Sequence, residues 1–225
     1  MKMHNWMTTP FTLRRYSVSF FLFFCLFFCL FGSSLYAGRP LILDDFEDAN
    51  LVDGPKWFLF GGLTAEIKQN DFTEFQHLGI NSLRLSGTTT SWYVGGVGAY
   101  LRIDGSQYQF MKLLVRGTGT QSGSLQIELY DDDNKNEVLE RSSSAPSQTL
   151  YDDKFIYTMD VTWMGWRVVI IPLTNFRDEN SQAGDNIFNP SKKDGSGGLL
   201  QLQFVVFANQ EKGKVDFLID SIRLY

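Results

Sequence analysis

Carboxylate side chains lie among strand-forming residues near both ends of the segment 38–225. Asp45 and Glu47 belong to the run Leu43–Glu47, and Asp220 belongs to the last run, residues 214–225. Calcium takes several oxygen ligands, among them carboxylates and backbone carbonyls. Asp45 and Glu47 share strand parity, so both would point to the same side. If the terminal strands are neighbours, Asp45, Glu47 and Asp220 could form part of a calcium site. The alternative is a set of solvated edge charges that limits aggregation.

Alternating side chains in two later runs indicate a sheet with one apolar and one mixed face. Successive residues of a strand point to opposite sides. The apolar set, which we expect in the core, is Leu125, Ile127, Leu129, Leu200, Leu202, Phe204 and Val206. The opposite set combines amides, a carboxylate and aromatic rings: Gln126, Glu128, Tyr130, Gln201, Gln203, Val205 and Phe207. That composition is typical of a sugar-binding face, and an ordinary solvated face has a similar one.

Aromatic side chains are a second reason to consider sugars as ligands. A pyranose ring presents an apolar face of C–H bonds, while its hydroxyls need fixed polar partners. The stacking candidates are Trp57, Phe60, Trp92, Tyr93, Tyr130 and Phe207. Most aromatic residues of a β-sandwich pack in its core, where we expect Trp163 and Trp166.

Catalytic chemistry has little support in the segment 38–225. It contains no cysteine and a single histidine, His77, which excludes thiol nucleophiles and His-clustered metal centres. No Gly-x-Ser-x-Gly turn accompanies His77, as a hydrolase of that type would require. A glycosidase pair of carboxylates is defined by distance in space and is not visible in a sequence. Gly95, Gly96 and Gly98 lie inside a strand-like run, which predicts a bulge or a close backbone approach rather than a phosphate loop.

The first 37 residues have the pattern of an export signal. Lys2, Arg14 and Arg15 precede an apolar run from Val18 to Phe31, and small residues lead to Ala37. This order predicts a secretory signal at 1–37 with cleavage after it. An uncleaved membrane anchor is the alternative. We therefore expect a secreted or periplasmic protein, with membrane contact only through this segment if it stays uncleaved.

Charge, length and turn residues bound the fold of the remaining segment. Residues 38–225 carry 17 basic and 25 acidic side chains, a net charge of −8, which argues against nucleic acid and anionic membranes as partners. The length suits one domain. Strands are predicted at 41–47, 57–67, 82–87, 91–103, 109–116, 123–130, 155–161, 165–171, 199–208 and 214–224. They predict an all-β sandwich or jelly roll. Polar loops at 131–148 and 175–198 could border a binding surface.

The order of several motifs resembles that of family 11 carbohydrate-binding modules. The motifs are Leu43–Glu47, Trp57, Ser86–Thr90 with Trp92-Tyr93, Trp166–Leu173 before Phe176, Phe207–Asn209 and Ile219–Ile222. The resemblance implies a galactose-binding-like jelly roll that contains calcium and binds β-1,4 and mixed-linkage β-glucans without catalysis. It also implies that Asp45, Glu47 and Asp220 hold a structural calcium ion.

The resemblance further implies where a sugar would lie. With the residues from the strand alternation, the candidate carbohydrate-binding set is Phe60, Trp92, Tyr93, Tyr130, Arg177, Asp178, Gln201, Gln203 and Phe207. The family has tyrosines at Phe60 and Phe207 and an acidic contact at Gln201. These departures remove hydroxyls and a charge, so the glucan that is bound can differ.

Part of the chain is also similar to the complex I intermediate-associated protein family. The similar residues are Trp57 followed by Gly61-Gly62, then Gly95–Arg102, then Lys112–Gly117. Those proteins share the jelly roll but act in assembly or protein binding without a sugar. We therefore expect a polysaccharide or oligosaccharide as the partner, with a protein of the cell envelope as the alternative. The export signal and the Asp-Asp-Phe-Glu opening favour the first.

Overall fold

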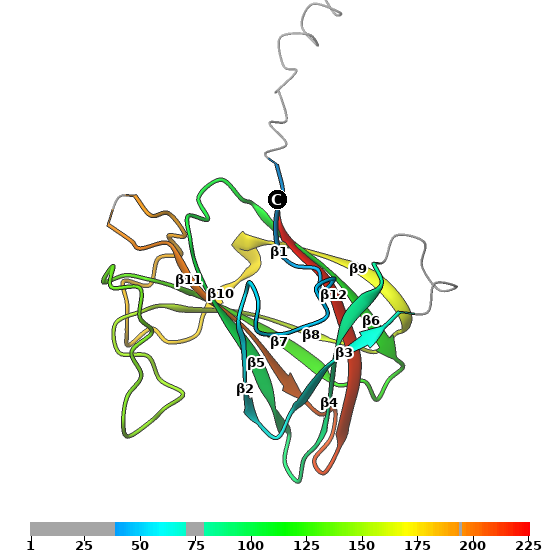
Figure 1. Cartoon of the computed structure of the whole chain (residues 1–225). Helices are drawn as coiled ribbons and strands as arrows, with labels where there is room; N and C mark the ends of the chain where they lie inside the picture. Colours follow the sequence, from blue (N-terminus) through cyan, green and yellow to red (C-terminus); the bar gives the residue numbers. More distant parts are fainter. Residues whose placement is uncertain (1–38, 71–78, 194) are drawn as a thin grey trace, which may run out of the picture. The chain divides into compact units, whose positions relative to one another are not determined.

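Antiparallel strands account for most of the described chain. The computed structural model describes residues 39–70, 79–193 and 195–225. The predicted signal at 1–37 and His77 lie outside the described residues. Among the described residues, the strands form two six-stranded sheets that face each other (Figure 1). None of the helices in this part of the chain is long and apolar enough to cross a membrane.

The first sheet, sheet A, joins the two ends of the domain. Its order is β3 (Thr64–Gln69), β4 (Asn81–Thr88), β12 (Lys214–Leu224), β6 (Phe110–Thr118) and β9 (Met164–Pro172), and β1 (Leu41–Asp44) also pairs with β12. In Figure 1 the red strand β12 runs through the middle of this sheet. The expected pairing of the terminal strands is confirmed, because Leu41 pairs with Leu224.

The second sheet, sheet B, carries the long loops. Its order is β10 (Arg177–Asp178), β8 (Lys154–Asp160), β7 (Ser124–Asp131), β11 (Leu199–Phe207), β5 (Tyr93–Ile103) and β2 (Trp57–Gly61). A short 3₁₀ helix, η1 (Leu173–Asn175), leads from β9 toward β10. We name residues 132–153 the first loop and residues 179–198 the second loop. Both extend from the same end of sheet B, on the left of Figure 1.

Apolar side chains from both sheets fill the space between them. Alternation on β7 and β11 places Leu125, Ile127, Leu129, Leu202, Phe204 and Val206 in this core, as predicted. Leu200 is an exception. The pairing register of β11 shifts between Leu199 and Gln201, so Leu199 enters the main core instead. Leu200 packs on the other side of sheet B with Tyr130 and Leu139, beneath the first loop.

Two predicted strands differ most from their predicted bounds. The segment predicted as 57–67 divides at Gly61 into β2 of sheet B and β3 of sheet A. Gly61 has a φ of 71°, and the Gly62 N–H donates to the carbonyl of Val94. Glycine suits this corner because it adopts positive φ without a steric penalty. The strand predicted at 41–47 ends at Asp44, and Phe46 then adopts a φ of 58°.

Candidate functional site

The outer face of sheet B carries two neighbouring hollows. The first, of about 430 Å³, is lined by Phe58, Phe60, Tyr93, Glu128, Tyr130, Arg141, Pro146, Ser147, Lys154, Gln203 and Val205. The second, of about 440 Å³, is lined by Trp92, Ser124, Gln126, Thr158, Asp160, Thr162, Phe207, Ala208 and Asn209. β7 supplies Ser124 and Gln126 to one and Glu128 and Tyr130 to the other, so the hollows follow one another along the strand. Both volumes lie in the range of about 300–1,000 Å³ found for ligand pockets.

A chain of hydrogen bonds forms the polar floor along β7. Glu128 accepts from Gln126 Nε2 at 2.7 Å and from the Tyr130 hydroxyl at 2.6 Å. Gln126 Oε1 in turn accepts from Thr158 Oγ1 at 3.3 Å. Glu128 is 6% exposed, and each carboxylate oxygen has a second lone pair available. The floor therefore offers a fixed charged acceptor to a ligand hydroxyl.

An aromatic wall stands on the β2 edge of the first hollow. Phe58 pairs across the sheet with Gly98, and Phe60 pairs with Gly96. A Cβ at Gly96 would lie 2.4 Å from Phe60 Cζ, and one at Gly98 would lie 2.6 Å from Phe58 Cζ. The glycines thus let both rings pack closely against β5. The predicted close approach at these glycines is confirmed, and the register of β11 against β5 also shifts opposite Gly95.

Aromatic rings also separate the two hollows. Tyr93 and Phe207 meet edge to face, with ring centroids 6.1 Å apart. Trp92 is 56% exposed, and its carbonyl accepts the Ala208 N–H at 2.8 Å. Burial, together with the charge of Glu128, raises the pKa of Tyr93, so its hydroxyl keeps its proton as a donor. A ligand crossing the boundary between the hollows would meet ring surfaces.

The structure brings most of the predicted binding residues together. Phe60, Tyr93, Tyr130 and Gln203 line the first hollow, and Trp92 and Phe207 line the second. Gln201 lies next to them, where its Oε1 accepts a hydrogen bond from Gln203 Nε2. Arg177 and Asp178 form β10 at the edge of sheet B and line neither hollow.

Two aromatic candidates have no ring surface for stacking. Trp57 is buried in the core, stacked on Phe204, and its Nε1 donates to Asp44 Oδ2 at 2.7 Å. Tyr130 is 1% exposed, because the first loop covers it and the Arg141 guanidinium lies 5.7 Å from its ring centroid. Tyr130 therefore positions Glu128 rather than a sugar ring.

Sequence reasoning missed several lining residues. Alternation placed Glu128 on the mixed face of β7, but Glu128 was not chosen as a binding residue. Phe58 has the parity of Phe60 on β2, so alternation could have identified it. Arg141, Pro146 and Ser147 lie in the first loop, where no alternation exists. Their place in the lining of the hollow depends on the fold of that loop, in which the backbones of Arg141 and Thr149 pair in an isolated antiparallel β-bridge.

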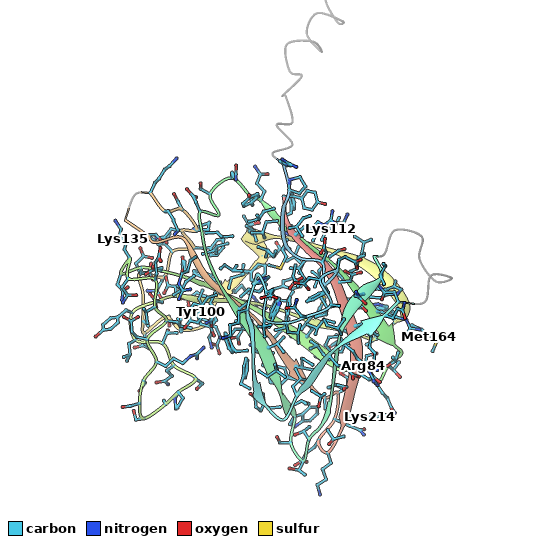
Figure 2. The ribbon with its side chains drawn as sticks, viewed as in Figure 1. Arg84, Tyr100, Lys112, Lys135, Met164 and Lys214 are labelled. Atoms are coloured by element: carbon cyan, nitrogen blue, oxygen red, sulfur yellow. The ribbon has the colours of Figure 1, made fainter. Side chains whose placement is uncertain are left out.

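The outer face of sheet A has a different character. Arg84 on β4 donates to Asp216 on β12 at 2.7 and 2.8 Å and to Glu66 on β3 at 3.0 Å. Lys68 joins this network through an ion pair with Glu66. Figure 2 labels Arg84 on this sheet and Tyr100 on sheet B. Charged pairs cover these strands of sheet A, whereas sheet B presents rings and amides.

The terminal acidic residues meet part of the expectation for a cation site. Asp45 and Glu47 follow β1 in a turn, so the predicted strand parity does not apply to them. Glu47 accepts the N–H groups of Ile80 at 2.9 Å and Asn81 at 3.0 Å. Asp220 is fully buried, and its carboxylate has no hydrogen-bond partner other than the adjacent Ser221. Burial, with the charges of Glu47 and Asp45, raises the pKa of Asp220 to about 7.

Two other buried oxygens of this part of sheet A also lack partners. Ser82 precedes Leu83, the cross-strand partner of Ile219, and its buried Oγ is unpartnered. The buried Oδ1 of Asn70 is unpartnered as well, while its Nδ2 donates to the carbonyls of Gly79 and Asn81. A buried carboxylate without a compensating charge is costly. These groups therefore fit a cation site in which Asp220 would be the main ligand.

Solved structures with a similar fold include carbohydrate-binding modules. The family 11 module from Clostridium thermocellum, in complex with a β-1,3-1,4-mixed-linked tetrasaccharide, aligns with a TM-score of 0.51 and 18% identity, over 82% of this chain and 94% of that chain. A family 30 carbohydrate-binding module aligns with a TM-score of 0.52 and 17% identity, over 83% and 98%. An exo-β-agarase aligns with a TM-score of 0.52 and 14% identity, over 82% of this chain and 24% of that chain.

Sequence comparison adds no relative. No family model and no curated protein matches the chain. At these low identities the structural likeness shows the fold alone. The predicted β-sandwich jelly roll is confirmed, and it is the fold of carbohydrate-binding modules of families 11 and 30.

Proposed function

We propose that this domain is a non-catalytic carbohydrate-binding module that takes a β-glucan or a related polysaccharide along the outer face of sheet B. The observation that carries the proposal is the pair of consecutive hollows, with exposed aromatic edges and a floor of amides and one buried carboxylate. An extended sugar chain needs this combination at regular intervals. The fold shared with carbohydrate-binding modules gives independent support.

Sugar rings and hydroxyls would contact different parts of the face. The apolar faces of the rings would stack on Phe58, Phe60, Trp92 or Phe207, while hydroxyls would bond to Glu128 and the amides beside it. Aromatic contacts contribute about 0.5–1.5 kcal/mol each, if the magnitude for aromatic pairs is carried over. A few such contacts give micromolar or weaker binding once the entropic cost of association is included.

The carboxylates of the two hollows support binding rather than hydrolysis. Among the described lining residues, Glu128 is the acidic side chain of the first hollow and Asp160 that of the second. Glycosidases place two carboxyl groups about 5–9.5 Å apart across one scissile bond. Asp160 also accepts a hydrogen bond from Ser124 Oγ at 2.5 Å. Each hollow therefore offers one acid, which suits a ligand contact.

Calcium near Asp220 belongs to the same proposal. Asp220, with Asp45 and Glu47 nearby, would hold the ion and neutralise charge between β1, β4 and β12. The ion would stabilise the scaffold, and it is remote from the outer face of sheet B. Secretion and cleavage after Ala37 stay predictions.

Affinity electrophoresis against a panel of soluble glucans tests the binding proposal. We expect retardation by at least one β-glucan, and loss of retardation in Phe60→Ala and Phe207→Ala variants. The matched control is Phe110→Ala, which removes a 39% exposed ring from sheet A and should leave retardation unchanged. No retardation of the wild-type protein by any glucan would refute the proposal and favour the protein-binding alternative.

A further inference from the structure

Three aspartates meet where β7 ends and β8 begins. Asp131 is the last residue of β7, Asp133 lies two residues later in the first loop, and Asp153 immediately precedes β8. One carboxylate oxygen from each lies within 4.8 Å of the others. This group is separate from Asp220, which lies on β12 of sheet A.

The three carboxylates share one pattern of hydrogen bonding. Asp131 Oδ2 accepts the N–H of Asn189 at 2.9 Å, Asp133 Oδ2 accepts that of Asp153 at 3.1 Å, and Asp153 Oδ2 accepts that of Ile187 at 3.2 Å. The remaining oxygen, Oδ1, is buried and unpartnered in all three. Asp131 and Asp153 are both 0% exposed. Backbone bonds therefore fix each carboxylate and leave one oxygen of each without a partner.

No basic side chain of the described residues forms an ion pair with these three aspartates. Lys154 pairs with Glu179, and Lys192 pairs with Glu137 at 3.0 Å. Burial, followed by the neighbouring negative charges, raises the pKa of Asp131 to about 8 and that of Asp133 to about 7. Buried carboxylates normally have a paired charge or a metal ion, so this group is a candidate for binding a cation.

The second loop completes the surroundings of the group. Gly184 has a φ of 65°, and a Cβ there would lie 2.0 Å from Asp153 Oδ1 and 2.5 Å from Asp133 Oδ2. The absence of a side chain at Gly184 thus keeps space open beside two of the carboxylates. Asn189, which donates its N–H to Asp131, also has a buried and unpartnered Oδ1. An amide oxygen is a further ligand of the kind that calcium accepts.

We propose that Asp131, Asp133 and Asp153 form a calcium site that joins the first loop to the second loop at the end of sheet B. The donor set contains only oxygen atoms, and three of them carry charge, which matches a hard divalent cation. The ion would hold the start and the end of the first loop together. It would also connect this loop to the second loop, because Asn189 and Gly184 of the second loop lie beside the three carboxylates.

Calcium titration of metal-free protein tests the site, with the number of ions bound per chain as the readout. The variant is Asp133→Asn/Asp153→Asn, which keeps the shape of both side chains and removes two charges. The control is Glu211→Gln, which removes one exposed carboxylate in the turn between β11 and β12. We expect the double variant to bind one calcium ion fewer than the wild type and the control to bind as many.

Thermal melting separates metal binding from a simple packing role. In chelator the double variant should melt at or above the wild-type temperature, because two of the three crowded like charges are gone. In excess calcium the order should reverse, since the wild type gains the binding free energy. If the double variant does not fold, Gly184→Ala fills the same space and keeps all three carboxylates. A folded variant that binds as many calcium ions as the wild type would overturn the site, as would calcium binding that only Asp220→Asn abolishes.

Discussion

Replacing Glu128 by Gln tests the polar floor of the binding face with little change in shape. Glu128 accepts hydrogen bonds from Gln126 and Tyr130, and it is the acidic residue that lines the first hollow. A glutamine has one acceptor oxygen and one NH₂ donor in the same geometry. The Tyr130 hydroxyl can turn to accept from that NH₂, so both internal hydrogen bonds can persist. The main change is the loss of the negative charge offered to the ligand.

The expected loss of affinity follows from the strength of charged hydrogen bonds. Hydrogen bonds to charged groups contribute about 1.5–3 kcal/mol and neutral ones about 0.5–1.5 kcal/mol. The difference of about 1–1.5 kcal/mol corresponds to a roughly 5- to 10-fold larger dissociation constant, that is, weaker binding. Because Glu128 is 6% exposed, solvent competes little for the bond and the upper part of this range applies.

Isothermal titration with the glucan oligosaccharide that the protein retains best would measure this change. Tyr130→Phe is the companion variant, since it removes only the hydroxyl that positions Glu128 and should weaken binding less than Glu128→Gln. Glu66→Gln is the control, because Glu66 carries the same charge on the outer face of sheet A. If Glu128→Gln is folded and binds as tightly as the wild type, the polar floor does not contact the sugar.

Three further predictions concern the wall, the loops and the opposite sheet. Gly98→Ala should weaken glucan binding in the same titration and lower the free energy of unfolding by about 1–3 kcal/mol, because the new Cβ would lie 2.6 Å from Phe58 Cζ and 2.9 Å from Gln203 Cγ. Chelation should weaken glucan binding and calcium should restore it, since the first loop lines the first hollow; equal affinity in chelator and calcium would contradict this. Hydrogen bonding to Arg84 holds the pKa of Asp216 below its usual value of 3.8, so the pair stabilises the fold above about pH 4 and this contribution is lost as the pH falls further. Urea unfolding should show Asp216→Asn to be less stable by about 1 kcal/mol or less at pH 7, with the difference shrinking steadily as the pH falls below about 4.

Strand positions could be predicted because alternation records which face is buried. Residues 214–224 match β12, and the other long strands differ from their predicted bounds by a few residues. The corner at Gly61 was missed because the apolar pattern continues from β2 into β3, although the chain changes sheets there. Leu200 was assigned to the wrong side because a shift of register reverses alternation, and a sequence does not mark such a shift.

Alternation also predicted which side chains share a face, but not what covers that face. Gln203 and Phe207 were placed correctly on the outer side of sheet B. Tyr130 has the same parity, yet the first loop buries it with Leu139 and Leu200. Trp57 was only a candidate for stacking, and nothing in its sequence neighbourhood shows that Asp44 accepts its indole N–H within the core. Such outcomes depend on contacts between segments far apart in the sequence.

The run Asp131-Asp132-Asp133 shows how a charged loop can be misread. Three consecutive acids suggest a solvated turn, and Asp132 does serve the loop itself by accepting the N–H groups of Asn136 and Glu137. Asp131 and Asp133 lie on either side of it, and in extended backbone such residues point to the same side. Their carboxylates meet that of Asp153, and Asp132 is buried as well, so this acidic stretch turns toward the protein rather than into solvent. Like charges brought together inside a protein require protons or a cation, and the loop they anchor carries Arg141 to the first hollow. A cation bound by these aspartates would therefore determine how firmly the first loop is held against the first hollow.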